Sequence, residues 1–154
     1  LARRLIDTDP ERAKAELADI EALTAEAIAG VRETIAGVRG AGLAEQLASC
    51  GNALRDAGVT LRVEGAVESL SPAQALTASW ILREATTNVL RHAHARTVIV
   101  RIAPGGFSVL DDGSGYAGDE GNGVRGMRER ATTGGASLAV RPGEPGGTTV
   151  EVTW

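Results

Sequence analysis

The sequence predicts an α/β fold, a sandwich of one mixed sheet with helices on one face, preceded by a long helix. Two observations support this prediction. Between residues 59 and 153, short segments with alternating apolar residues recur, and segments with the three-to-four-residue spacing of helices separate them. Strands that occur in pairs and are interrupted by helices favour a sandwich over a doubly wound fold.

Length and composition limit the classes of protein to which the chain can belong. A chain of 154 residues has the size of one domain, and 43% hydrophobic residues with only 3% aromatic ones predict an aliphatic core. The formal net charge of -4 gives no electrostatic reason to expect nucleic acid or an anionic membrane as a partner. Cys50 is the single cysteine, which excludes an internal disulfide and favours a cytoplasmic location. No apolar run reaches the roughly 18 residues that span a bilayer, so this piece is not expected to cross a membrane.

The first predicted element is a long amphipathic helix over residues 11 to 38. Asp9 is a candidate N-cap, Pro10 suits the first helical position, and Gly40 and Gly42 break the chain afterwards. Its apolar stripe follows a heptad through Leu17, Thr24, Val31 and Val38. Two interpretations stay open, packing against a partner helix in a bundle and coverage of a sheet in its own domain. Because a helical pattern is already under way at Leu1, the chain is expected to be part of a longer protein.

Periodicity and turn residues define the remaining elements. A helix over residues 43 to 57 ends at Gly58, and a second helix begins at Ser71 and Pro72 and runs through Leu90. A glycine-rich loop over residues 111 to 123 is too long for a tight turn. A third helix is predicted at 123 to 132, and strands are predicted at 59 to 63, 97 to 103, 107 to 110, 137 to 140 and 148 to 153.

Three polar residues of the second helix are candidates for a metal and phosphate site. Glu84, Asn88 and His92 are spaced four apart, so they line one side of the helix. Mg²⁺ prefers oxygen ligands and retains phosphate oxygens, which makes Asn88 a candidate metal ligand. Glu84 is a candidate to orient a metal-bound water or to act as a general base, and Arg91 and His92 are candidates to meet phosphate oxygens. The alternative is a solvated helix face.

A carboxylate followed by glycines is a candidate site for a nucleotide base. Asp111 ends an apolar strand and enters a loop that contains Gly113 and Gly115. The carboxylate can accept a hydrogen bond from an adenine amino group, and glycine permits a flat base to lie against the backbone. The alternative is a simple Asp-Gly turn.

The segment Gly121 to Gly126 has the spacing G-x-G-x-x-G. The dinucleotide-binding interpretation of this spacing requires a βαβ unit, and too few residues follow Gly126 to form one. A phosphate site remains possible on physical grounds, because backbone amides at a helix N-terminus bind phosphate where glycines allow it to approach. Arg125 either adds positive charge to such a site or is a surface residue paired with Glu129.

Together these segments resemble the ATP-binding domain of sensor histidine kinases, specifically the DesK-like or NarL-associated class of bacterial two-component systems within the GHKL ATPase superfamily. Residues 82 to 93 resemble the N box of that class, in which Glu84 replaces the first of two Asn residues. Residues 111 to 115 resemble the G1 box, residues 121 to 130 the G2 box and residues 146 to 148 the last glycine box. One departure is Thr86, where the family usually carries an apolar residue facing the core.

The resemblance implies a fold and a set of ligands. The fold is the Bergerat sandwich shared with gyrase, Hsp90 and MutL, with residues 1 to 40 as partial dimerisation helices, residues 41 to 154 as the ATP-binding domain, and a short lid at about 116 to 122. The implied cofactors are ATP and Mg²⁺. Asn88 would hold the metal, Asp111 would read adenine, Thr148 would support the adenine site, and the phosphates would lie against Gly121, Gly123, Val124, Arg125 and Gly126.

The resemblance also implies an activity and partners. The γ-phosphoryl group would pass to a histidine upstream of this chain and then to a response regulator, in a homodimeric and membrane-anchored parent. Two alternatives stay open. One is a non-catalytic, nucleotide-responsive binding module that signals through the long helix, and the other is a serine kinase of the same fold that resembles the anti-sigma factors.

Overall fold

The computed structural model describes residues 42 to 115, 121 to 143 and 146 to 154. The chain separates into two units, Leu1–Val38 and Arg39–Trp154, and the described residues belong to the second. The predicted helix at 11 to 38 and all but the last two residues of the predicted lid lie outside the described residues.

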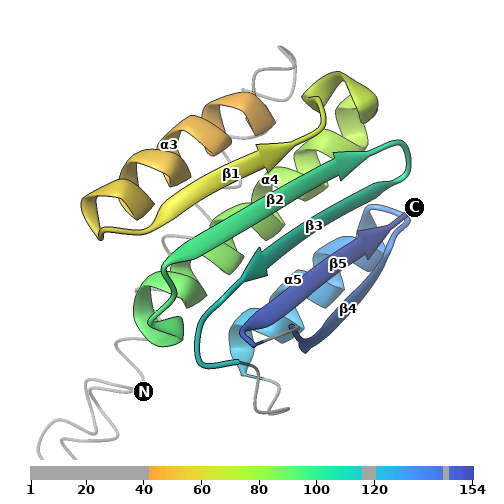
Figure 1. Ribbon diagram of the computed structural model, residues 1–154. Helices are drawn as coiled ribbons and strands as arrows, with labels where there is room; N and C mark the ends of the chain where they lie inside the picture. Colours follow the sequence, from red (N-terminus) through yellow and green to blue (C-terminus); the bar gives the residue numbers. More distant parts are fainter. Residues whose placement is uncertain (1–41, 116–120, 144–145) are drawn as a thin grey trace, which may run out of the picture. The chain divides into compact units, whose positions relative to one another are not determined.

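A five-stranded mixed sheet forms one layer of this unit. Its strands follow the order β1-β2-β3-β5-β4 (Figure 1). The strands are β1 (Thr60–Glu64), β2 (Thr97–Ala103), β3 (Gly106–Asp111), β4 (Ser137–Pro142) and β5 (Thr148–Thr153). β1 pairs with β2 in parallel, and all other pairs are antiparallel. The predicted strand pairs at 97 to 110 and 137 to 153 are therefore present as antiparallel neighbours.

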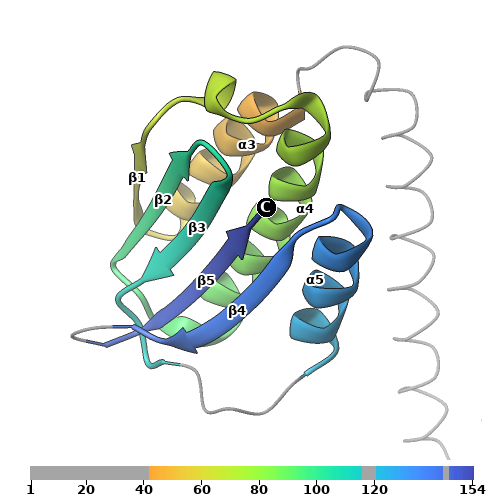
Figure 2. The ribbon, with the colours of Figure 1, turned by 90° about the vertical axis from the view of Figure 1, so that its right-hand side faces the viewer.

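Three helices cover one face of the sheet (Figure 2). They are α3 (Gly42–Asp56), α4 (Pro72–Asn88) and α5 (Asn122–Thr133), and a short 3-10 turn, η1 (Val67–Ser69), precedes α4. This arrangement confirms the predicted α/β sandwich. The space between the layers is filled mainly by aliphatic side chains from both, as the composition predicts, and the single phenylalanine, Phe107, is also fully buried there.

Helix α4 positions much of the site, and its sequence explains both of its ends. At the start, Ser71 Oγ accepts a hydrogen bond from Gln74 N at 3.3 Å, and Gln74 Oε1 accepts one from Ser71 N at 2.8 Å. This capping box stabilises the first turn, with Pro72 at the first helical position. At the other end, the helix widens into a π-helical turn, η2 (Val89–Ala93), and His94 adopts a left-handed conformation with φ 51°.

Thr86 lies on the buried side of α4, where it is only 4% exposed. Its Oγ1 is a buried polar atom without a hydrogen-bond partner in the described part of the chain. The departure noted in the sequence therefore places a hydroxyl in the core. Because an unpaired buried hydroxyl destabilises the folded state, Thr86 lowers the free energy of unfolding.

Candidate functional site

A cavity of about 390 Å³ lies between α4, α5 and the ends of β3, β4 and β5. Most of the predicted site residues line it: Glu84, Asn88, Arg91, His92, Asp111, Gly115, Gly121, Gly123, Val124 and Thr148. The structure thus brings together four segments that are separated in the sequence, namely the end of α4 with η2, the end of β3 with the loop after it, the start of α5 and the start of β5.

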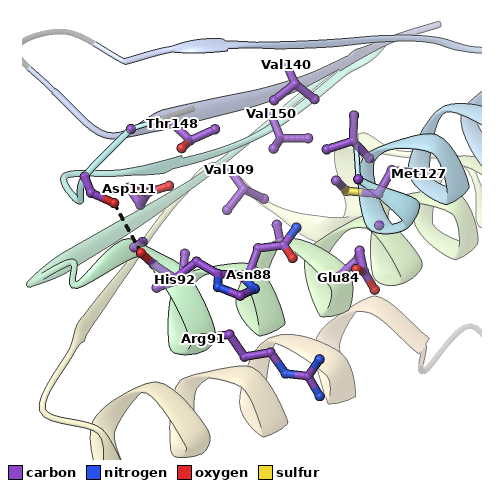
Figure 3. A pocket seen from close by; sticks show the side chains of 18 of the residues that line it. Glu84, Asn88, Arg91, His92, Val109, Asp111, Met127, Val140, Thr148 and Val150 are labelled. Atoms are coloured by element: carbon purple, nitrogen blue, oxygen red, sulfur yellow. Dashed lines mark hydrogen bonds between the residues drawn. The ribbon is translucent and has the colours of Figure 1, made fainter. Parts of the chain in front are cut away.

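The polar residues of α4 and of η2, which continues it, form one wall of the cavity (Figure 3). Glu84 and Asn88 are half-buried, whereas Arg91 and His92 are exposed. In Figure 3, Asn88 extends toward the sheet, while the Arg91 side chain extends to the opposite side of the helix. Asn88 and Glu84 therefore offer side-chain oxygens inside the cavity, and Arg91 lies at its margin.

Asp111 is the last residue of β3 and faces the cavity from the sheet. Burial raises the pKa of its carboxyl above the ordinary value, and hydrogen bonds from Gly113 and Thr148 oppose this increase. One of these bonds joins Gly113 N to Asp111 Oδ1 at 2.9 Å. A half-buried carboxylate with fixed backbone partners is a well-placed hydrogen-bond acceptor for a ligand amino group.

Two glycines allow the backbone to close around Asp111. Gly147 has φ +84°, and a Cβ there would collide with the Asp111 carbonyl oxygen. This close approach leads directly into β5, whose first residue is Thr148. Gly113 was predicted to face the ligand and does not line the cavity. Instead, a Cβ on Gly113 would collide with the Ala93 carbonyl, so this glycine allows the loop to pack against the end of η2.

The start of α5 forms the third side of the cavity. Gly121 is the N-cap residue and makes no side-chain cap hydrogen bond, so no side chain of the cap occupies the amides of the first turn. A Cβ on Gly123 would collide with the Glu84 carboxylate, which shows how closely α5 approaches α4 here. The same two helices are joined further along, where the guanidinium groups of Arg83 and Arg130 lie 4.2 and 4.3 Å from the ring centre of Trp80.

Two residues of the G-x-G-x-x-G segment lie outside the cavity, contrary to the prediction. Arg125 points to solvent and pairs with Glu129 at 3.5 Å, with 71% of each side chain exposed, which agrees with the surface alternative. Gly126 faces open space, since a Cβ there would meet only the Arg130 guanidinium at 3.8 Å. Helical periodicity explains both, because Gly123, Val124 and Met127 share the face of α5 that lines the cavity, and positions 125 and 126 fall on the other side of the helix.

Apolar side chains that the motifs did not indicate form the inner wall of the cavity. They are Val109, Val140 and Val150 on the sheet and Met127 on α5 (Figure 3). Val109 and Val150 lie opposite each other in the β3–β5 register, and Val140 opposes Val150 in the β4–β5 register. A row of branched side chains across neighbouring strands is a surface on which a flat aromatic group can lie. The alternating apolar pattern of each strand indicates which valines face the helices. The strand order is also needed to know that these valines lie next to one another.

The donor set suits a hard cation better than a softer metal. Within residues 42 to 115, 121 to 143 and 146 to 154, no three His, Cys, Asp or Glu side chains gather as a metal site. The side-chain oxygens that line the cavity are those of Asn88 and Glu84 on α4, of Asn122 on α5, and of Asp111, Ser114 and Thr148 from β3, the loop after it and β5. Mg²⁺ fits such a sparse set of oxygens, because it completes its octahedron with water and substrate phosphates.

Within the same described ranges, no helix is both long and apolar enough to cross a membrane.

Comparisons with known proteins relate the chain to one group of proteins. No family model matches the chain. Two curated relatives from Bacillus subtilis (strain 168) are each 32% identical to it: sensor histidine kinase YvfT over 84% of the chain and 37% of the relative, and sensor histidine kinase DesK over 91% of the chain and 40% of the relative. The chain thus spans about two fifths of the length of these relatives.

Solved structures show the same fold. The Acinetobacter baumannii histidine kinase AdeS aligns with a TM-score of 0.60 at 14% identity, over 97% of this chain and 88% of that one. The blue-light-activated histidine kinase EL346 of Erythrobacter litoralis aligns with a TM-score of 0.59 at 26% identity, over 73% of this chain and 40% of that one. The chain is therefore a homologue of the sensor histidine kinases, and its described part has the fold of their kinase domains.

Proposed function

We propose that this chain is the ATP- and Mg²⁺-binding catalytic part of a two-component sensor histidine kinase. The observation that carries the proposal is a single cavity on which Asp111, Asn88 and the uncapped start of α5 converge. These groups supply, respectively, an acceptor for a base, an oxygen for a cation and amides for phosphate. The homology to sensor histidine kinases supports the same assignment.

The sheet side of the cavity is assigned to the adenine base. The carboxylate of Asp111 accepts a hydrogen bond from the adenine amino group, and Thr148, beside it, supports this site. The apolar row of Val109, Val150 and Val140 provides a dry surface for the ring. Gly115 lines the cavity with φ +90° and places no side chain beside the base.

The helix side is assigned to the cation and the phosphates. Asn88 would hold Mg²⁺ through its carboxamide oxygen, and the bound ion would neutralise phosphate charge. Gly121, Gly123 and Val124 place amides of the first turn of α5 against the phosphates, where the helix dipole favours negative charge. His92 lies at the exposed margin of this region and is assigned to the outer phosphate oxygens. Arg91 is assigned there as well, and its side chain would change conformation to reach them, because it extends to the opposite side of the helix from Asn88.

The proposed reaction transfers the γ-phosphoryl group to a histidine upstream of this chain, and then to a response regulator. Positioning and charge neutralisation supply most of the catalysis in phosphoryl transfer. Glu84 is the candidate catalytic residue on this chain, since its carboxylate lies beside both Asn88 on α4 and Gly123 on α5. From this position it can orient a water or accept a proton.

A transfer experiment tests the proposal. The chain is mixed with Mg²⁺, ATP labelled in the γ-phosphate, and a separately made segment that carries the upstream histidine. Labelled, acid-labile phosphate on that histidine supports the histidine kinase. Binding of ATP with no transfer to the histidine supports a non-catalytic binding module, and acid-stable label on a serine supports the serine kinase that resembles the anti-sigma factors.

A further inference from the structure

Asp112 is an exposed residue that follows the base-side carboxylate directly and does not line the cavity. Its Oδ1 accepts hydrogen bonds from two backbone amides, Arg96 N at 2.7 Å and Thr97 N at 2.8 Å. Its own backbone N donates to Thr97 O at 3.3 Å. Three hydrogen bonds therefore join this one residue to the start of β2.

The position of these bonds in the sheet matters because the strand ladder ends here. The last register pair between β2 and β3 joins Val98 to Asp111. The next described residues, 112 to 115, belong to no strand, and the side chain of Asp112 continues the attachment to β2 by one residue. The following residues are held from the other side, since Ser114 N donates to Ala93 O at 2.7 Å and Ser114 Oγ donates to His92 O at 3.2 Å.

We propose that Asp112 is a positioning residue, which fixes the Asp111 carboxylate in the place and orientation needed to select the nucleotide base. This inference rests on the proposed function of the cavity. Asp111 itself is fixed on one side by the β2–β3 ladder and on the other by Asp112, so loss of the Asp112 bonds frees the backbone next to the acceptor. Because hydrogen bonds weaken steeply with poor angle and distance, a loosened acceptor discriminates less between an amino group and a carbonyl group on the base.

The test is a calorimetric titration with Mg-ATP and Mg-GTP of the unaltered chain and two variants. Asp112→Asn retains an Oδ1 acceptor for both amides, whereas Asp112→Ala removes it. We expect Asp112→Ala to lower the ATP-to-GTP affinity ratio by about tenfold, the size expected when charge-assisted hydrogen bonds are lost. Asp112→Asn should retain most of the ratio, because its amide oxygen still accepts from both backbone amides, although without the added strength of the charge.

Ser71→Ala is the matched control. It also removes a side-chain acceptor for a backbone amide, but at the opposite end of α4 from the cavity. It should lower the melting temperature and leave the ATP-to-GTP ratio unchanged, which separates positioning from a general loss of stability. If Asp112→Ala does not fold, Asp112→Glu replaces it, because the longer side chain keeps the charge and displaces the acceptor.

The outcomes are distinct. An unchanged ATP-to-GTP ratio in the folded Asp112→Ala variant, or in Asp112→Glu where it is the substitute, overturns the role of Asp112, while ATP binding by the unaltered chain leaves the proposed function in place. Equal losses in Asp112→Asn and Asp112→Ala also overturn it, because charge and not hydrogen bonding would then be responsible. Failure of the unaltered chain to bind ATP overturns the proposed function and, with it, the positioning role.

Discussion

Replacing Thr86 with valine should stabilise the protein, because it removes a buried hydroxyl that has no hydrogen-bond partner. The side chain is 4% exposed, and Oγ1 has no partner among the described residues. A buried, unsatisfied polar group costs about 1–3 kcal/mol, and a methyl group of nearly the same shape restores an apolar contact without opening a cavity. Threonine and valine are both β-branched and have similar helix propensities, so the substitution changes the stability of the helix itself very little.

We therefore expect Thr86→Val to raise the free energy of unfolding by about 1–2 kcal/mol, which corresponds to a few degrees in melting temperature for a chain of this size. Thermal and urea unfolding followed by circular dichroism measure this change. Thr77→Val is the control on the same helix, since Thr77 is also buried but its Oγ1 donates to Ala73 O at 3.3 Å. It should be neutral or destabilising. A loss of stability in Thr86→Val, or equal effects of the two substitutions, would refute the reasoning.

Three further predictions concern the cavity itself. Asn88→Ala should weaken binding of Mg-ATP far more than binding of ADP measured without metal, and calorimetry showing equal losses would remove Asn88 from the metal site. Asp111→Asn should abolish preference for adenine nucleotides and yet raise stability at neutral pH. Burial raises the pKa of the Asp111 carboxyl in the folded state, so ionisation of this group lowers the stability of the unaltered chain as the pH rises above about 3.8. The difference in stability between Asp111→Asn and the unaltered chain should therefore vanish in acid. A difference that stays constant across pH would contradict this cause. Gly147→Ala should lower both melting temperature and ATP affinity, because the new Cβ meets the Asp111 backbone, whereas Gly58→Ala, at a similar φ of +76° but in open space, should lower the melting temperature alone.

Within the described residues, local signals in the sequence predicted the three α-helices and the five strands. The capping residues Ser71 and Pro72 define the start of α4, and Gly58, with φ +76°, follows the end of α3 as expected for a helix terminator. The alternating apolar residues predicted each strand to within two residues at either end. Helix caps and strand periodicity depend on residues that are close in the sequence, so they can be recognised without knowledge of the fold.

The site required information about residues distant in the sequence. The apolar wall exists because β5 inserts between β3 and β4, and this strand order places Val109, Val150 and Val140 in one row. The sequence pattern places Gly113 beside the ligand, whereas in the structure Gly113 packs against Ala93. These two residues are twenty apart in the sequence, so the contact depends on the fold. The π-helical turn η2 could not be predicted either, because the spacing used to predict helices is that of an α-helix, with 3.6 residues per turn.

Asp112 illustrates a third kind of limit. An aspartate before glycine in a loop is typical of a turn, and the sequence supports no more than that. Only the fold places the Arg96 and Thr97 amides within 2.8 Å of its carboxylate. These bonds, that of Thr97 above all, lower the pKa of Asp112, so its contribution to stability is present above about pH 3.8 and is lost as the pH falls through the lower folded-state pKa. The two adjacent carboxylates thus have opposite pH dependences.

An amide-resolved NMR titration of the unaltered chain with Mg-ATP locates the ligand most directly. Binding in the proposed cavity predicts saturable shifts at Asn88, Asp111, Gly123 and Thr148, and a smaller set at the α4 end when Mg²⁺ is withheld. Shifts confined to other surfaces, such as the groove between α3 and β1 lined by Leu47 and Val63, would contradict the assignment, as would an absence of shifts at saturating nucleotide.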